Sequence, residues 1–225
     1  MGADGTAYNR YHNICGMQFF PEQVQDEIHG LLILAVADGK QLFFDFNAVF
    51  LGIFHQAFQG FLAHYGSFRG VTSYLALVGK KGPDLEETCG YYGERLVLKA
   101  QQLGLNTCWV ALTYSKVSSA FTVAAGEKLC AVIAIGYGKT QGVPHRSKAM
   151  EKVTKTDGPA PDWFTAGVEA ALLAPTAMNQ QKFQFTLAED KVSVRAGMGF
   201  YTKIDLGIVR YHFEAGAGKE HFTWA

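Results

Sequence analysis

Residues 163–185 read WFTAGVEAALLAPTAMNQQKFQF, and this stretch predicts a helix, a polar turn and a strand in succession. Pro175 lacks an N–H group and clashes with the preceding helical turn, so we expect the helix to end or kink there. The turn concentrates hydroxyl and amide side chains between two apolar elements: Thr176, Asn179, Gln180 and Gln181. These groups could meet the polar edge of a planar ligand, or they could make only local hydrogen bonds in a loop.

The composition indicates a globular chain with a large core. Of the 225 residues, 48% are hydrophobic and 18% are charged, which excludes a disordered chain. We expect a single domain over residues 1–225, with residues 1–12 disordered and residues 138–161 forming a linker-like segment between two halves. The formal net charge of zero gives no electrostatic reason to expect nucleic acid or an anionic membrane as a partner.

The cysteines are widely scattered along the chain, at Cys15, Cys89, Cys108 and Cys130. Without closely spaced partners they argue against a zinc site and a disulfide scaffold, and they fit a reducing compartment. The first twenty residues lack the basic start and apolar run of a signal peptide. No apolar run reaches the length of a membrane span. We therefore expect a soluble cytoplasmic protein without a bound metal.

Helices and strands alternate irregularly. Pro21 opens a helix that should run to about Val36. Later apolar patterns predict strands at 71–78, 107–112, 130–137, 183–187 and 190–196, and helices at 84–103, 163–173 and 204–215. This order predicts the α+β class with a mixed sheet and a hairpin near the end of the chain.

Common catalytic signatures are missing from the sequence. The segment 134–140 (AIGYGKT) resembles a phosphate loop, but the Walker pattern requires glycine where Ile133 stands. There is no G-x-G-x-x-G between a strand and a helix, no H-E-x-x-H and no G-x-S-x-G. The sequence thus gives no support for a Rossmann site, a zinc protease or an α/β-hydrolase.

Two other segments carry groups suited to binding. Arg146 and Lys148 lie two residues apart after a buried strand, where both could contact one phosphate, or where they could form a solvated basic loop. Residues 104–112 (GLNTCWVAL) give a helix stop followed at once by a strand. Backbone N–H groups at such a strand end could meet a ligand's carbonyl and ring nitrogen.

Taken together, these segments resemble the nitroreductase family of flavoproteins. GLNTCW at 104–109 looks like the family's GLGTCW turn, and APTAMNQQ at 174–181 resembles its APSxxNxQ element. AIGY at 134–137 followed by RSK at 146–148 is similar to its last strand and phosphate grip. The APSxxN element follows the GLGTCW turn here, an order similar to that of a thermophile-type subgroup of nitroreductases.

The resemblance implies a mixed, largely antiparallel sheet with helices on both faces, in a homodimer with FMN at the interface. It implies an oxidoreductase in which NADH or NADPH gives hydride to flavin N5. A nitroaromatic, a quinone or a similar small acceptor then takes the electrons. The flavin performs the chemistry, so the resemblance assigns no catalytic side chain.

The family motifs also imply which residues hold FMN. Arg146 and Lys148 would bind its phosphate, and the backbone of Ala111 and Leu112 would face N5 and O4. Thr176 and Asn179 in the polar turn would hydrogen-bond the flavin's ring edge or its ribityl chain. Gln181 in the same turn and Arg10 in the opening segment are further candidates for binding the cofactor.

The opening segment departs from the family pattern. The family begins with R-x-S-x-R, and one alignment register places Asn13, Cys15 and Met17 at these positions, whereas another keeps only Arg10. This departure supports an alternative, in which the fold is kept while the flavin site has decayed. The chain would then act as a non-catalytic binding or scaffold dimer.

Overall fold

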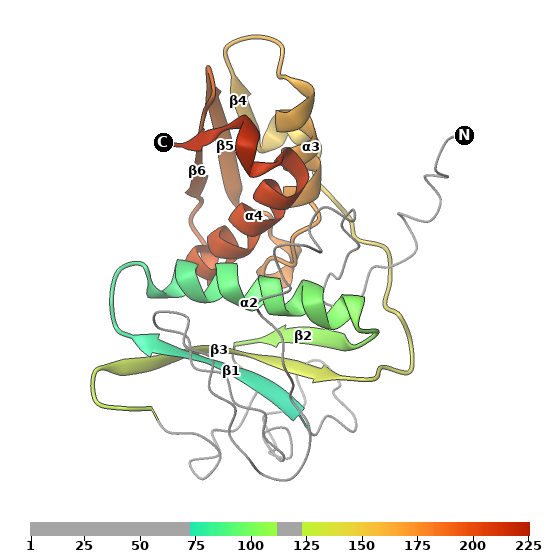
Figure 1. Ribbon diagram of the computed structural model, residues 1–225, viewed down its shortest axis with the longest axis vertical. Helices are drawn as coiled ribbons and strands as arrows, with labels where there is room; N and C mark the ends of the chain where they lie inside the picture. The colour runs from blue at the N-terminus through green and yellow to red at the C-terminus, as the bar shows by residue number, and fades with distance from the viewer. Residues whose placement is uncertain (1–72, 112–122) are drawn as a thin grey trace.

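The structure, a computed structural model, describes residues 73–111 and 123–225. In these ranges the strands form two separate sheets (Figure 1). We expected one mixed sheet with helices on both faces, and the described residues differ in this respect because helices are packed between the two sheets. The helix expected from Pro21 to Val36 and the segment 1–12 lie outside the described residues.

The first sheet is antiparallel and has the order β1-β3-β2. Its strands are β1 (Ser73–Lys80), β2 (Asn106–Val110) and β3 (Glu127–Gly136). The central strand, β3, is buried without interruption from Cys130 to Ala134. Such a continuous apolar run is expected of a strand that is covered on both faces.

Helix α2 (Leu85–Gln102) covers one face of this sheet. Asp84 occupies the N-cap position, but its side chain makes no capping hydrogen bond. Gly104 ends the helix as predicted, with a φ of 76° that favours glycine. This conformation lets the N–H of Leu105 donate to the carbonyl of Ala100 at 2.9 Å, which is a bond of the Schellman motif.

The second sheet is mixed and has the order β4-β5-β6-β7. Strands β5 and β6 form the predicted hairpin, while β4 and β7 pair in parallel with β5 and β6. The strands are β4 (Thr154–Thr156), β5 (Phe183–Ala188), β6 (Lys191–Ala196) and β7 (Thr223–Trp224). Because β4 lies within residues 138–161, the segment expected to be linker-like also contributes a strand to this sheet.

Helices α3 (Asp162–Ala171) and α4 (Thr202–Ala217) pack on each other, and α4 also packs on α2 and on strands β5 and β6. The layers therefore run from the first sheet through α2 and α4 to the second sheet (Figure 1). At the α2–α4 crossing, two glycines face backbone atoms of the opposite helix. A Cβ on Gly90 would lie 2.1 Å from the carbonyl oxygen of Ile204.

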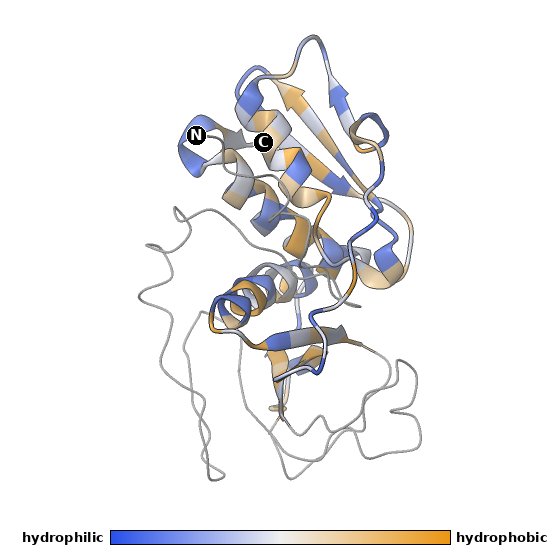
Figure 2. Cartoon of the chain, turned by 90° about the vertical axis from the view of Figure 1, so that its right-hand side faces the viewer, coloured by the Kyte–Doolittle hydropathy of each residue, from blue (hydrophilic) through white to orange (hydrophobic). Residues whose placement is uncertain are grey.

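Aromatic side chains fill the core between α4 and the second sheet. Phe213 of α4 is fully buried and stacks on Phe185 of β5, with ring centroids 4.6 Å apart. Phe164 and Phe222 meet Phe213 edge-on. Apolar segments gather where strands and helices meet (Figure 2). Within the described ranges, no helix is long and apolar enough to cross a membrane.

Candidate functional site

The polar turn between α3 and β5 has an unusual backbone. A 3₁₀ turn, η4 (Ala177–Asn179), follows Pro175, and α3 has already ended at Ala171. Met178, Asn179 and Gln181 have φ values of 53°, 52° and 44°. Residues other than glycine rarely adopt this left-handed region, and they keep it where the surrounding contacts over-determine it. The turn must therefore be held by its neighbours.

The basic segment around Arg146 supplies part of that support. The carbonyl oxygen of Arg146 accepts hydrogen bonds from Nδ2 of Asn179 at 3.0 Å and from Nε2 of Gln181 at 2.8 Å. The backbone N–H of Lys148 donates to Oε1 of Gln181 at 2.7 Å. Two predicted binding segments that are more than thirty residues apart in sequence thus lie against each other.

Lys148 and Thr176 complete the cluster. Nζ of Lys148 donates to the carbonyl oxygens of Gln180 at 2.8 Å and Gln181 at 3.0 Å. The hydroxyl oxygen of Thr176 accepts the backbone N–H of Gln181 at 3.0 Å. Thr176 and Gln181 are buried, with 6% and 3% of their surfaces exposed. We call Arg146, Lys148, Thr176, Asn179 and Gln181 the polar cluster.

Much of the hydrogen-bonding capacity of the polar cluster is used within the protein. Both ends of the Gln181 amide are engaged, and Nζ of Lys148 has used two of its three donors. The groups that remain for a ligand are the exposed guanidinium of Arg146, the exposed amide of Asn179, the third donor of Lys148 and the Thr176 hydroxyl hydrogen. Cationic and neutral N–H donors are suited to a phosphate or to ring carbonyl oxygens.

Asp205, in the first turn of α4, also holds the polar turn, and the sequence analysis missed it. Its Oδ1 accepts the N–H of Ala177 at 2.8 Å, and its Oδ2 accepts Nε2 of Gln180 at 2.6 Å. Burial raises the pKa of this carboxyl from 3.8 to about 6, although both hydrogen bonds act to lower it. An acidic residue near a helix start is common in sequences, and nothing in the pattern indicated this partner.

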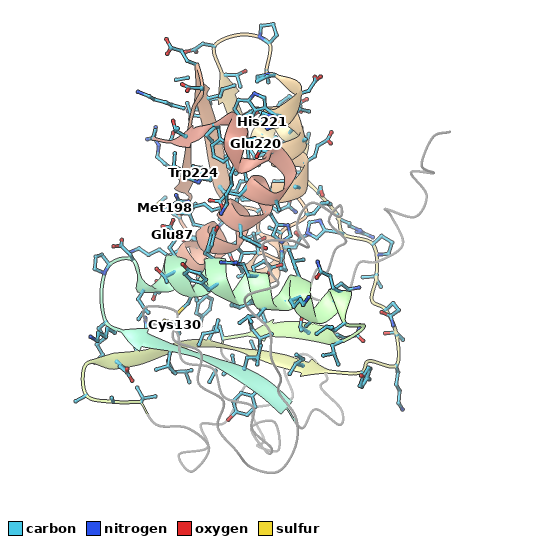
Figure 3. All side chains as sticks on the ribbon, viewed as in Figure 1. Glu87, Cys130, Met198, Glu220, His221 and Trp224 are labelled. Atoms are coloured by element: carbon cyan, nitrogen blue, oxygen red, sulfur yellow. The ribbon has the colours of Figure 1, made fainter. Side chains whose placement is uncertain are left out.

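The GLNTCW segment follows the end of α2 and forms most of strand β2. Oδ1 of Asn106 accepts the N–H of Gly138 at 2.8 Å, which fixes the exit of β3. Ala111 follows β2 directly and is half-buried. Cys89 and Cys130 are free and buried. Figure 3 labels Cys130 on the sheet beneath α2.

Two predicted flavin ligands cannot be placed. Arg10 and Leu112 lie outside the described residues. Of the remaining six candidates, the structure brings five together in the polar cluster. Ala111 follows strand β2 of the first sheet. Among the described residues, it makes no hydrogen bond to the polar cluster.

A buried ionisable network links α2, β2 and α4. Nε2 of His212 lies 2.8 Å from Oε1 of Glu94, and neither side chain is exposed. Nε1 of Trp109 donates to Oε2 of Glu94 at 2.9 Å. Nδ1 of His212 lies 3.1 Å from the carbonyl oxygen of Ala170. The network therefore joins three helices and the strand that leads to Ala111.

The described elements define the class as α+β, with long helices between two sheets. A family model described as "Putative TM nitroreductase" matches residues 19–217 of the chain. The chain therefore belongs to this nitroreductase family, which confirms the resemblance noted in the sequence. The match includes every segment on which the resemblance was based.

The chain is also similar to solved structures, of which the first described here agrees with this assignment at the level of the fold. A putative nitroreductase from Thermotoga maritima is 21% identical, with a TM-score of 0.55, and the alignment covers 96% of this chain and 88% of that one. A putative NADH dehydrogenase/NAD(P)H nitroreductase from Bacteroides thetaiotaomicron is 14% identical, with a TM-score of 0.42. That alignment covers 68% of this chain and 97% of the Bacteroides chain. A comparison with curated proteins found no match.

Proposed function

We propose that the chain is an FMN-dependent oxidoreductase that uses NADH or NADPH to reduce a nitroaromatic, a quinone or a similar small acceptor. Family membership makes an oxidoreductase the expected class. The observation that carries the cofactor proposal is the docking of the Arg146–Lys148 segment on the polar turn, because it places donors from both motifs in one cluster.

The donor set of the polar cluster fits the phosphate end of FMN. The guanidinium of Arg146 is exposed and makes no ion pair or hydrogen bond within the described residues. Lys148 is anchored by two carbonyl oxygens and keeps one donor. A fixed ammonium, two residues along the chain from an exposed guanidinium, suits a dianion, since charge-assisted hydrogen bonds are strongest when the donors are already oriented.

The other members of the cluster would act mainly by orienting this grip. Gln181 holds the backbone of Arg146 and Lys148, and Thr176 holds the backbone of Gln181. Asn179 is exposed and would use its second amide hydrogen on the ligand. Contact of the flavin ring with the backbone of Ala111 and Leu112 stays a prediction, and so does contact of the phosphate with the side chain of Arg10.

When bound, FMN would accept hydride from the nicotinamide and pass electrons to the acceptor, so the protein need only bind, orient and shield the reactants. We propose that the protein acts in the cytoplasm as a homodimer whose subunits together complete each site.

Visible spectra test the proposal directly. Purified protein mixed with FMN and passed through a gel-filtration column should elute with flavin absorption. Under anaerobic conditions NADH or NADPH should bleach that absorption, and a nitroaromatic or a quinone should restore it. A colourless protein fraction after FMN loading would instead support the alternative of a decayed flavin site. The internal use of Gln181 and most of Lys148 is the observation that favours this alternative.

A further inference from the structure

A basic groove lies on the face of the second sheet opposite α4. It has a volume of about 400 Å³. The register pairs Gln184 with Arg195 and Lys155 with Thr186, and paired residues on neighbouring strands share a face. Since Phe183 and Phe185 alternate with Gln184 and point into the core, the side chains of Lys155 and Arg195 stand on the open face.

Five cationic residues line this groove: Lys148, Lys152, Lys155, Lys182 and Arg195. No carboxylate lines it, and none of the five takes part in an ion pair with another described residue. The whole chain carries equal numbers of acidic and basic residues, 20 of each. The groove is therefore a local concentration of positive charge, and such a concentration attracts anions.

We infer that this groove binds the phosphate groups of the nicotinamide dinucleotide and that it favours NADPH over NADH. This inference rests on the proposed function. The groove and the polar cluster share Lys148 and Gln181, so a ligand held by its phosphates in the groove extends toward the flavin site. NADPH carries a 2′-phosphate in addition to the pyrophosphate, and this further dianion meets the cations that a single flavin phosphate leaves unpaired.

The composition of the groove favours a small phosphorylated ligand over a nucleic acid. Single-stranded nucleic acids are held by exposed aromatic platforms together with cations. The aromatic residue of the groove is Phe183, which is only 5% exposed. Met198, labelled in Figure 3 where β6 leads into α4, supplies an exposed apolar side chain at the groove that could contact an adenine ring.

Calorimetric titration with two fragments tests the inference without any redox step. The fragments are 2′,5′-ADP, the adenosine end of NADPH, and 5′-AMP, the adenosine end of NADH. The full chain should bind 2′,5′-ADP about tenfold more tightly, as expected for one additional dianion held by partly solvated cations. The preference should decrease with added salt, because exposed charges are screened.

Two variants assign this preference to the groove. Lys155→Gln with Arg195→Gln should reduce the tenfold preference to about twofold. Lys191→Gln is the matched control: it removes one positive charge from the same strand as Arg195, outside the groove, and should keep the preference. Equal affinity for the two fragments in the unmodified chain, or an unchanged preference in the double variant, would overturn the inference. Displacement of 2′,5′-ADP by a much lower concentration of a single-stranded oligonucleotide would also overturn it.

The flavin spectrum of the same samples separates the two proposals. Retained FMN without a 2′,5′-ADP preference means that the groove inference fails while the proposed function stands. A groove-dependent preference in protein that retains no FMN means that the groove binds the fragment while the proposed function fails. The variants are at exposed positions, and thermal unfolding of each variant should show that it keeps the fold.

Discussion

The crossing of α2 and α4 makes a sharp prediction about stability, through the substitution Gly207→Ala. A Cβ at this position would lie 1.9 Å from the carbonyl oxygen of Glu87 and 2.6 Å from the backbone nitrogen of Tyr91. Both atoms belong to the backbone of α2, so no side-chain rotation relieves the contact. The two helices would have to move apart, and with them the first turn of α4, where Asp205 holds the polar turn.

The magnitude follows from two opposing terms. Helix propensity alone favours alanine over glycine by about 1 kcal/mol. Overpacking costs about 1–3 kcal/mol, and the backbone contact places Gly207→Ala at the upper end, near 3 kcal/mol. We therefore expect a net loss of about 2 kcal/mol in the free energy of unfolding.

Urea unfolding, followed by circular dichroism, measures this loss if the dependence on urea concentration is unchanged between variants. Gly82→Ala is the control, because a Cβ there would have no heavy atom within 4 Å. It should change stability by less than about 0.5 kcal/mol. A Gly207→Ala protein as stable as the unmodified chain would show that the helices are not in backbone contact.

Three further substitutions test the site and its supports. The pKa of the Asp205 carboxyl is raised from 3.8 to about 6 on folding, so the unfolded state loses this proton at lower pH than the folded state does. The free energy of unfolding should therefore fall by on the order of 3 kcal/mol as the pH rises from about 4 to about 6. Asp205→Asn should remove this decline, which urea midpoints measured across the same pH range would show. Glu94→Ala removes the buried carboxylate that meets both Nε2 of His212 and Nε1 of Trp109, and it should cost about 3 kcal/mol or more. Glu220→Ala, which breaks an exposed contact of 3.7 Å with a histidine, should cost less than about 1 kcal/mol in the same urea assay. Lys148→Met removes the donor to two turn carbonyls, so amide hydrogen exchange of the polar turn should accelerate, and unchanged exchange would contradict the anchoring role.

Local patterns predicted the elements of the described regions well. The period of apolar residues indicated α2, α3 and α4, and the left-handed Gly104 was foreseeable because few other residues end a helix in that way. The β5–β6 hairpin followed from alternating residues around the Glu189 turn. These features depend on residues close in sequence, which is why the pattern alone was sufficient.

Assembly of the elements was harder to predict. The close crossing of α2 and α4 depends on Gly90 and Gly207, which meet the backbone of the opposite helix although they are more than a hundred residues apart. The role of Asp205 likewise depends on a tertiary contact with Ala177. The approach of Arg146 to the polar turn was implied by the family resemblance and by no local pattern. Distant pairings of this kind leave no periodic signal in one sequence.

Binding of FMN by the polar cluster is tested most directly by titrating the protein with FMN and following the quenching of flavin fluorescence. The unmodified chain should bind one FMN per subunit, and Arg146→Gln should weaken binding about tenfold, because it removes the free guanidinium assigned to the phosphate. Lys139→Gln, an exposed change in the same connection, should leave the affinity unchanged. Equal FMN affinity in Arg146→Gln and the unmodified chain, or no saturable binding in either, would contradict a flavin site at this cluster.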